Sequence, residues 1–240
     1  MTQHNHAAHS HPAHSHSGHS HAAKVVLGAE HFDSHARAWD EDPAFIDRAT
    51  QIAAGIRAAV PLRDDMRALD FGCGTGLLSF PLRQSLGHII LEDASPGMLQ
   101  VVKEKIAAQQ IANMTPRLAE PTVAGLPDER FDLIYSSMVL HHIPDTAAIL
   151  RTWHGQLNPG GWLCIADLAL EDGSFHGADV DVHHGFATNS LIVLAKDAGF
   201  VDPAVSTVLH IAKATPEGTR DFPVFLLVAR KVQADGNRGN

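Results

Sequence analysis

The sequence predicts an α/β fold. We expect one doubly wound sheet of seven strands, mostly parallel, with one antiparallel strand near an edge and helices on both faces. Short apolar runs alternate with helical patterns between residues 66 and 200, which is typical of parallel strands joined by crossover helices. The last two apolar runs, 204–212 and 222–231, are separated only by the polar loop "KATPEGTRD" and therefore pair antiparallel. A glycine-rich turn follows the first run, at the sheet edge where such folds bind ligands.

The first 23 residues consist mainly of His, Ala and Ser, so they cannot bury a core, and we expect a disordered tail. Spaced imidazoles of this kind predict weak binding of zinc, nickel or copper. We also expect the tail to be dispensable for the chemistry of the folded part. The tail histidines are His4, His6, His9, His11, His14, His16, His19 and His21.

Residues 24–60 predict an N-terminal cap of two helices. The first lies within "HFDSHARAWDEDP" and carries Phe32, Ala36 and Trp39. In the second, Asp42 is the N-cap and Pro43 takes the first helical position. Pro61 ends this helix, and its predicted buried stripe consists of Phe45, Ala49, Ile52, Ile56 and Ala59.

Residues 61–232 predict the main domain, and residues 233–240 a disordered C-terminal tail. The first five strands are expected in "MRALDF", "HIILED", "MTPRLAE", "FDLIYSS" and "WLCIADL". A helix near 76–86 contains Pro81, which should kink or shorten it. Further helices begin after the caps Ser95 and Asp145 and near residue 188, while "NPGG" breaks the chain before the fifth strand. A polar insertion, 171–187, is expected to form a lid.

The composition excludes several classes of function. The formal net charge is −9 and no cluster of lysine or arginine occurs, so we expect neither nucleic-acid nor membrane binding. No apolar stretch reaches the ~18 residues of a membrane span, and the N-terminus does not resemble a secretory signal. The two cysteines, Cys73 and Cys164, suit a reducing compartment, so a cytoplasmic location is expected.

The glycine turn lies in "ALDFGCGTGLL", and its spacing discriminates between two ligand classes. A nicotinamide site requires G-x-G-x-x-G, whereas here the third glycine comes one residue early and Leu77 occupies its place. Asp70 at the end of the strand would repel a pyrophosphate but attract a ligand with ammonium and sulfonium groups. The turn therefore favours a cationic ligand over NAD.

"ALDFGCGTG" resembles the first motif of class I S-adenosylmethionine-dependent methyltransferases. "LEDASPGML", "FDLIYSSMVLHHI" and "LNPGGWLCIADL" resemble later motifs of this family, in the family's order. The resemblance extends from Glu30 to Lys231 and is greatest to the small-molecule group that includes the quinone-biosynthesis C-methyltransferases. It implies a Rossmann-like fold and an enzyme that transfers methyl from S-adenosylmethionine to a small-molecule acceptor by in-line displacement. S-adenosylhomocysteine is the implied product.

The resemblance also implies a set of cofactor contacts. Asp70 would hold the methionine ammonium, and Asp93 would accept hydrogen bonds from the ribose hydroxyls, with Glu92 as a competing candidate. Met98 would pack on the adenine, and Glu120 would accept from its amino group. The full set is Asp70, Gly72, Cys73, Gly74, Asp93, Ala94, Met98, Glu120, Pro121 and Ser136.

Two groups of histidines are candidates for the acceptor side. His141 and His142 follow the fourth strand, and "FHGADVDVHHGF" contributes His176, Asp179, Asp181, His183 and His184. We expect His141 to lie near the cofactor and His183 or His184 to accept a proton from the acceptor. Packing, or a divalent metal in the lid, remains an alternative, although the main expectation is no metal in the fold. The rival functions are a non-catalytic S-adenosylmethionine-binding or metal-handling protein and an NAD-dependent oxidoreductase.

Overall fold

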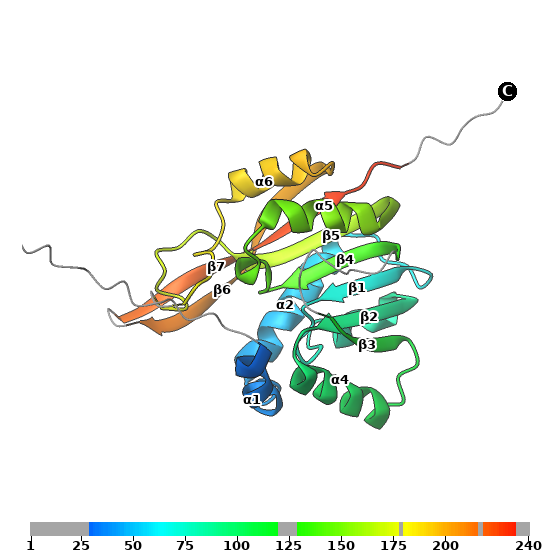
Figure 1. The fold of residues 1–240 in the computed structure, drawn as a ribbon, viewed down its shortest axis with the longest axis horizontal. Helices are drawn as coiled ribbons and strands as arrows, with labels where there is room; N and C mark the ends of the chain where they lie inside the picture. The colour runs from blue at the N-terminus through cyan, green and yellow to red at the C-terminus, as the bar shows by residue number, and fades with distance from the viewer. Residues whose placement is uncertain (1–28, 120–128, 178–179, 216–217, 234–240) are drawn as a thin grey trace, which may run out of the picture.

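The fold is a seven-stranded sheet with strand order β3-β2-β1-β4-β5-β7-β6 (Figure 1). The computed structural model describes residues 29–119, 129–177, 180–215 and 218–233. Only β7 runs antiparallel to its neighbours, β5 and β6, which confirms the predicted fold class. The strands are β1 (Arg67–Phe71), β2 (His88–Asp93), β3 (Met114–Leu118), β4 (Phe131–Ser137), β5 (Leu157–Leu168), β6 (Val201–Thr215) and β7 (Gly218–Arg230).

Helices cover both faces of the sheet (Figure 1). Asp42, Ser95 and Asp145 each accept a hydrogen bond from a backbone N–H in the first turn of a helix, as predicted for N-caps. The helix after the glycine turn is only four residues long and continues as the 3-10 turn η1 (Arg83–Ser85), so Pro81 lies in a shortened helix, as predicted. The helices are α1 (Ala29–Trp39), α2 (Pro43–Ala59), α3 (Ser79–Leu82), α4 (Pro96–Ala108), α5 (Thr146–Gln156) and α6 (Thr188–Asp197). None of those described is long and apolar enough to cross a bilayer.

The sheet separates two apolar cores. One packs β-strand side chains against α2, α3 and α4, and the other packs them against α5 and α6. The predicted stripe of α2 is correct for Ala49, Ile52 and Ile56, which are buried, but wrong for Ala59, which is exposed. Val60, the C-cap residue with extended backbone (φ −118°, ψ 128°), is buried instead, just after the helix ends.

The segment predicted as a loop between the last two strands is a β-hairpin instead. β6 extends to Thr215 and β7 begins at Gly218, so the hairpin projects beyond the carboxyl ends of the parallel strands (Figure 1). Lys213 Nζ donates a 2.5 Å hydrogen bond to the carbonyl of Phe175, in the segment after β5. Arg220 pairs with Asp172 of the same segment. The extension folds because the segment after β5 gives it a surface to pack on.

The predicted break at "NPGG" is also strand, since β5 begins at Leu157. Phe131 of β4 pairs with Leu157 and Leu133 with Trp162, so the residues of "NPGG" form a bulge in β5 at this shift of register. The segment after β5 returns to the sheet through a bridge between Ala169 and Phe186. This brings the predicted lid close to the carboxyl ends of β4 and β5.

Candidate active site

The glycine turn at the end of β1 has three residues with positive φ, namely Gly72 (70°), Gly74 (54°) and Gly76 (80°). A Cβ on Gly72 would lie 2.5 Å from the Val139 side chain, so this glycine permits close packing. A Cβ on Gly74 would meet no heavy atom of the described residues within 4 Å. The space beside Gly74 is therefore open, and a ligand can approach the backbone there.

Asp93, at the end of β2, holds this turn from the side. Its Oδ2 accepts a 2.7 Å hydrogen bond from the Gly74 N–H, and its Oδ1 accepts one of 2.8 Å from the Ser95 N–H. Burial raises the pKa of the Asp93 carboxyl, while these backbone donors oppose the shift. The carboxylate thus connects the glycine turn to the N-terminus of α4.

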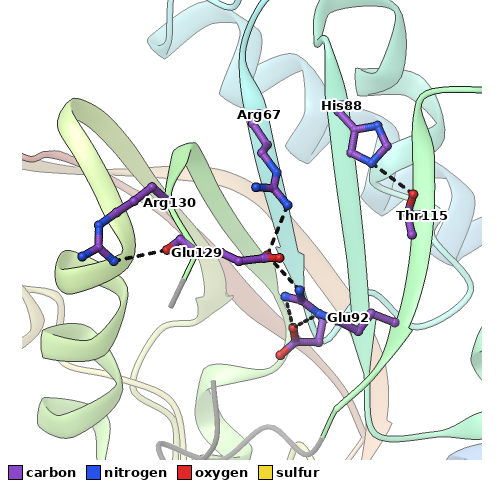
Figure 2. A network of polar contacts seen from close by, with 7 residues as sticks. Arg67, His88, Glu92, Thr115, Glu129 and Arg130 are labelled. Carbon is purple, nitrogen blue, oxygen red and sulfur yellow. Dashed lines mark hydrogen bonds and ion pairs between the residues drawn. The ribbon is translucent and has the colours of Figure 1, made fainter. Parts of the chain in front are cut away.

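Glu92, the competing acid, belongs to a network of polar contacts with the neighbouring strands (Figure 2). Its Oε2 accepts hydrogen bonds from Arg117 of β3, the shorter of which is 2.5 Å. Arg117 also donates to Glu129, which in turn pairs with Arg67. Glu92 therefore belongs to a network that joins β1, β2 and β3, whereas Asp93 contacts the glycine turn.

Asp70 is buried beneath the turn. Its Oδ2 accepts a 2.6 Å hydrogen bond from Ser79 Oγ, which lies 2.5 Å from the Tyr135 hydroxyl. Burial raises the pKa of Asp70 to about 7, the Ser79 hydrogen bond opposes the shift, and the charge of Asp93 adds to it. The pKa of the neighbouring Cys73 thiol is also raised, mainly by burial, which disfavours the thiolate.

Helix α1 covers the same end of the sheet. Asp33 accepts hydrogen bonds from Ser95 Oγ (2.5 Å) and from the Gly97 N–H (2.7 Å) at the start of α4. Asp40 pairs with Lys105 at 2.5 Å and accepts from the hydroxyl of Thr75 in the glycine turn. The predicted cap helix is thus attached directly to the turn and to α4, which the sequence did not predict.

The remaining predicted cofactor residues have the following positions. Met98 is buried against Ala36 of α1, and Ala94 is half-buried between Asp93 and Ser95. Ser136, at the end of β4, donates from its hydroxyl to the Phe71 carbonyl at 2.9 Å. Glu120 and Pro121 lie outside the described residues, as does the histidine-rich tail.

Histidines from two distant segments meet beside β4 and β5. His141 and His142 lie in the 3-10 turn η2 (Leu140–His142), and His176 lies in the segment after β5. Asp167 Oδ1 accepts a 2.6 Å hydrogen bond from Nδ1 of His141, and both residues are buried. The Nε2 atoms of His141 and His176 are 3.0 Å apart. Burial, the main cause, lowers the pKa of His176 to about 4, so its ring is neutral at neutral pH.

The other two predicted catalytic histidines, His183 and His184, lie outside the group of His141, His142 and His176. The backbone N–H of His183 donates to the His141 carbonyl at 2.8 Å, and its Nε2 donates to the Ile143 carbonyl at 3.0 Å. His184 packs against Gly173, and among the described residues no partner bonds its buried Nε2. Asp179 lies outside the described residues. Sequence reasoning missed Asp167, although an acid that ends the buried run "WLCIADL" is a detectable signal.

Comparisons with known proteins agree with this architecture. A family model described as "Methyltransferase domain" matches residues 45–203. An uncharacterized methyltransferase of Schizosaccharomyces pombe is 31% identical over an alignment of 159 residues. The match covers 60% of this chain and 56% of that protein. A ubiquinone biosynthesis O-methyltransferase of Parvibaculum lavamentivorans is 32% identical over 126 residues, 52% of this chain and 49% of the relative. The chain thus spans about half the length of these curated relatives.

Solved structures share the fold at lower identity. Phosphoethanolamine N-methyltransferase 2 of Haemonchus contortus, solved with phosphomonomethylethanolamine and S-adenosylhomocysteine, superposes with a TM-score of 0.69 at 17% identity. The match covers 87% of this chain and 61% of that one. The strand order, the glycine turn and the family match over residues 45–203 agree, and the chain belongs to the class I S-adenosylmethionine-dependent methyltransferase family.

Proposed function

We propose that this protein transfers a methyl group from S-adenosylmethionine to a small-molecule acceptor. The observation that carries the proposal is the open space at Gly74, where Asp93 holds the Gly74 N–H and Asp70 is buried at the end of the preceding strand β1. A sulfonium cofactor with an ammonium group is complementary to acids at this position, and a pyrophosphate is not. Solved relatives of the same fold carry this cofactor or its product.

The cofactor roles expected from the sequence become part of this proposal. Asp93 would accept from the ribose hydroxyls with the lone pairs that Gly74 and Ser95 leave available, since a carboxylate offers about four acceptor sites. Asp70 would hold the ammonium, directly or through water. The backbone of Gly72, Cys73, Gly74, Ala94 and Ser136 would line the cofactor, with Met98, Glu120 and Pro121 on the adenine side.

The bound cofactor would supply a methyl group already activated by a positive sulfur. The acceptor's lone pair forms the new bond to carbon, the carbon–sulfur electron pair stays on sulfur, and any acceptor proton must leave. The protein therefore has to align the acceptor, and alignment contributes about 7–11 kcal/mol in favourable cases. Helix α1, tied to the glycine turn through Asp40, would help to exclude water from this step.

We assign activation of the acceptor to His141 among the predicted candidates His141, His183 and His184. The Nδ1–H of His141 donates a hydrogen bond to Asp167. Nε2 of His141 therefore carries the lone pair, and it faces His176. His183 and His184 would act by supporting the turn that carries His141, because His183 already donates to backbone carbonyls. The acceptor atom itself differs among relatives, since some are named for O-methylation and others for N-methylation.

The direct test is methyl transfer from labelled S-adenosylmethionine to a panel of small acceptors that carry a hydroxyl group, an amine, a thiol or an acidic C–H group. Labelled product that requires the protein, together with S-adenosylhomocysteine in equal amount, supports the proposal. Tight cofactor binding without product from any acceptor supports a non-catalytic S-adenosylmethionine-binding protein instead. Deletion of the histidine-rich residues 1–23 should leave product formation unchanged.

We expect Gly74→Ala to abolish cofactor binding and to preserve the fold. Its φ of 54° strains any L side chain, at a cost of about 1–2 kcal/mol, and the new Cβ fills the open space. The matched control is Gly155→Ala, on the exposed side of the helix α5. There a Cβ also meets no atom within 4 Å in the part of the chain that the structure describes. Calorimetry with S-adenosylhomocysteine measures both variants. Normal affinity in Gly74→Ala would mean that the ligand does not approach this turn.

Affinity for S-adenosylhomocysteine should rise with pH and level off above about 7. The pKa of Asp70 is about 7 in the free protein, and the ligand's ammonium is complementary to the ionised carboxylate. Below that pKa, proton release on binding weakens affinity by up to about tenfold per pH unit. The groups facing Asp70 are Ser79, Tyr135, Cys73 and Asp93. Calorimetry between pH 5.5 and 8.5 measures the slope.

Asp70→Asn is the control, because it removes the titrating carboxyl and keeps the shape of the side chain. Its affinity should be lower at pH 8 and vary little with pH. A flat profile in the unmodified protein, or an unchanged slope in Asp70→Asn, would show that Asp70 does not meet the ammonium.

A further inference from the structure

Three imidazoles converge beside β4 and β5 in an arrangement suited to a metal ion. One ring nitrogen from each of His141, His142 and His176 lies within 4.8 Å of the others. The ring centroids are 4.2 Å apart for His141 and His142, 4.9 Å for His141 and His176, and 5.5 Å for His142 and His176. Zn–N distances of about 2.0–2.1 Å in a tetrahedral site place ligand nitrogens about 3.3 Å apart. Binding one ion would therefore require these nitrogens to close from their present separations of up to 4.8 Å.

Asp167, the partner of His141, is positioned to orient a metal-binding histidine. A histidine that binds metal through one nitrogen usually donates from the other to a carboxylate, which fixes the ring and its tautomer. Asp167 accepts from His141 Nδ1 at 2.6 Å and from the His141 and Leu168 backbone N–H groups. Nε2 of His141 is consequently the nitrogen that faces the cluster.

The charge balance also favours a cation. Asp167 is fully buried, and within the described residues its ion-pair partner is His141. A buried carboxylate is costly unless a positive charge accompanies it. Lys213 faces His176 and opposes a cation, but its ammonium is held by the Phe175 carbonyl and lies over the Phe175 ring. A divalent ion bound through His141 would supply the charge that Asp167 lacks.

We propose that His141, His142 and His176 bind one divalent cation of the zinc class, with Asp167 as the positioning residue of His141. Three histidines leave a fourth coordination position for water or for an oxygen or sulfur of another molecule. If the proposed methyl transfer is correct, this position suits an acceptor hydroxyl or thiol. Coordination would favour release of its proton to solvent, and the anion would then attack the methyl carbon.

The site is formed only when two segments come together. η2 supplies two ligands, and the segment after β5 supplies the third, 34 residues beyond His142 in the chain. The β6–β7 hairpin holds this second segment through Lys213 and Arg220. The metal would thus tie the predicted lid to the carboxyl end of β4.

The test is titration of the full chain with Co²⁺ and Zn²⁺, without cofactor or acceptor, so that its outcome is independent of the methyl-transfer proposal. The tail is expected to bind metals as well, so the parent protein carries serine in place of His4, His6, His9, His11, His14, His16, His19 and His21. We expect one equivalent of Co²⁺ to give the intense visible absorption of four-coordinate cobalt, which Zn²⁺ then displaces. His142→Ala and His176→Ala, two half-buried positions, should each weaken binding more than tenfold.

Asp167→Asn should weaken binding about 10–100-fold, as expected for the carboxylate behind a ligand. His210→Gln is the matched control, because His210 forms a similar pair with Asp221 at 2.7 Å on the exposed surface. It should leave binding unchanged. Circular dichroism of each variant verifies the fold. Absence of stoichiometric binding in the tail-substituted parent would overturn the proposal, and so would binding that survives either folded histidine variant.

Discussion

His141→Gln should lower the turnover of methyl transfer by about 10²–10⁴-fold, the range typical of losing a group that activates a substrate. Glutamine retains a donor toward Asp167 but has no basic nitrogen at the position of Nε2. The loss is expected whether the imidazole acts by itself or through a bound ion. Affinity for S-adenosylhomocysteine should change little, because Asp93, Asp70 and the glycine turn remain. Steady-state kinetics with the identified acceptor, together with calorimetry, measures the two effects separately.

His210→Gln serves as the control for this prediction as well. The His210–Asp221 pair has nearly the same geometry as His141–Asp167 but lies in solvent. The turnover of the His210→Gln variant should match that of the unmodified protein. Equal activity of His141→Gln and the unmodified protein would show that acceptor activation does not depend on this imidazole.

Asp93→Ala should weaken cofactor binding by about 1.5–3 kcal/mol, the range for hydrogen bonds to a charged group. The substitution removes both the acceptor for the ribose hydroxyls and the carboxylate that holds the Gly74 and Ser95 N–H groups. A lower melting temperature should therefore accompany the weaker binding. Calorimetry with S-adenosylhomocysteine at a temperature where the variant is folded measures the binding effect.

Glu92→Gln is the matched control, since Glu92 precedes Asp93 in the chain but pairs with Arg117. It should lower stability through the network of Figure 2 and leave cofactor affinity close to normal. The opposite result, with Glu92→Gln weakening the cofactor and Asp93→Ala leaving it unchanged, would assign the ribose to Glu92.

Local signals in the sequence were sufficient for most of the fold. Asp42, Ser95 and Asp145 cap their helices because a cap depends on residues within one turn. The β6–β7 hairpin could not be predicted in this way, because "KATPEGTRD" reads locally as a loop. Its described residues, 213–215 and 218–221, are strand, and they contact Phe175 and Asp172, which lie 38 and 48 residues before their partners in the hairpin.

The same distinction applies to the site. The glycine turn and the position of Asp93 follow from short motifs, since each is defined by neighbours in the chain. The histidine cluster does not, because the sequence contains two separate histidine groups and the fold selects members of both. His176 joins His141 and His142, whereas His183, from the same segment as His176, bonds to backbone carbonyls. Both residues are histidines of the same polar segment, so only the path of the folded segment distinguishes their roles.

Calorimetric titration of the full chain with S-adenosylmethionine, S-adenosylhomocysteine and NAD at pH 8 tests the central claim most directly. We predict saturable binding of S-adenosylmethionine and of S-adenosylhomocysteine at one site per chain and no detectable binding of NAD. The physical reason for this selectivity is the pair of acids near the glycine turn, Asp93 bound to the Gly74 N–H and Asp70 buried at the end of β1. Tight NAD binding, with no response to S-adenosylmethionine or to S-adenosylhomocysteine, would contradict the account.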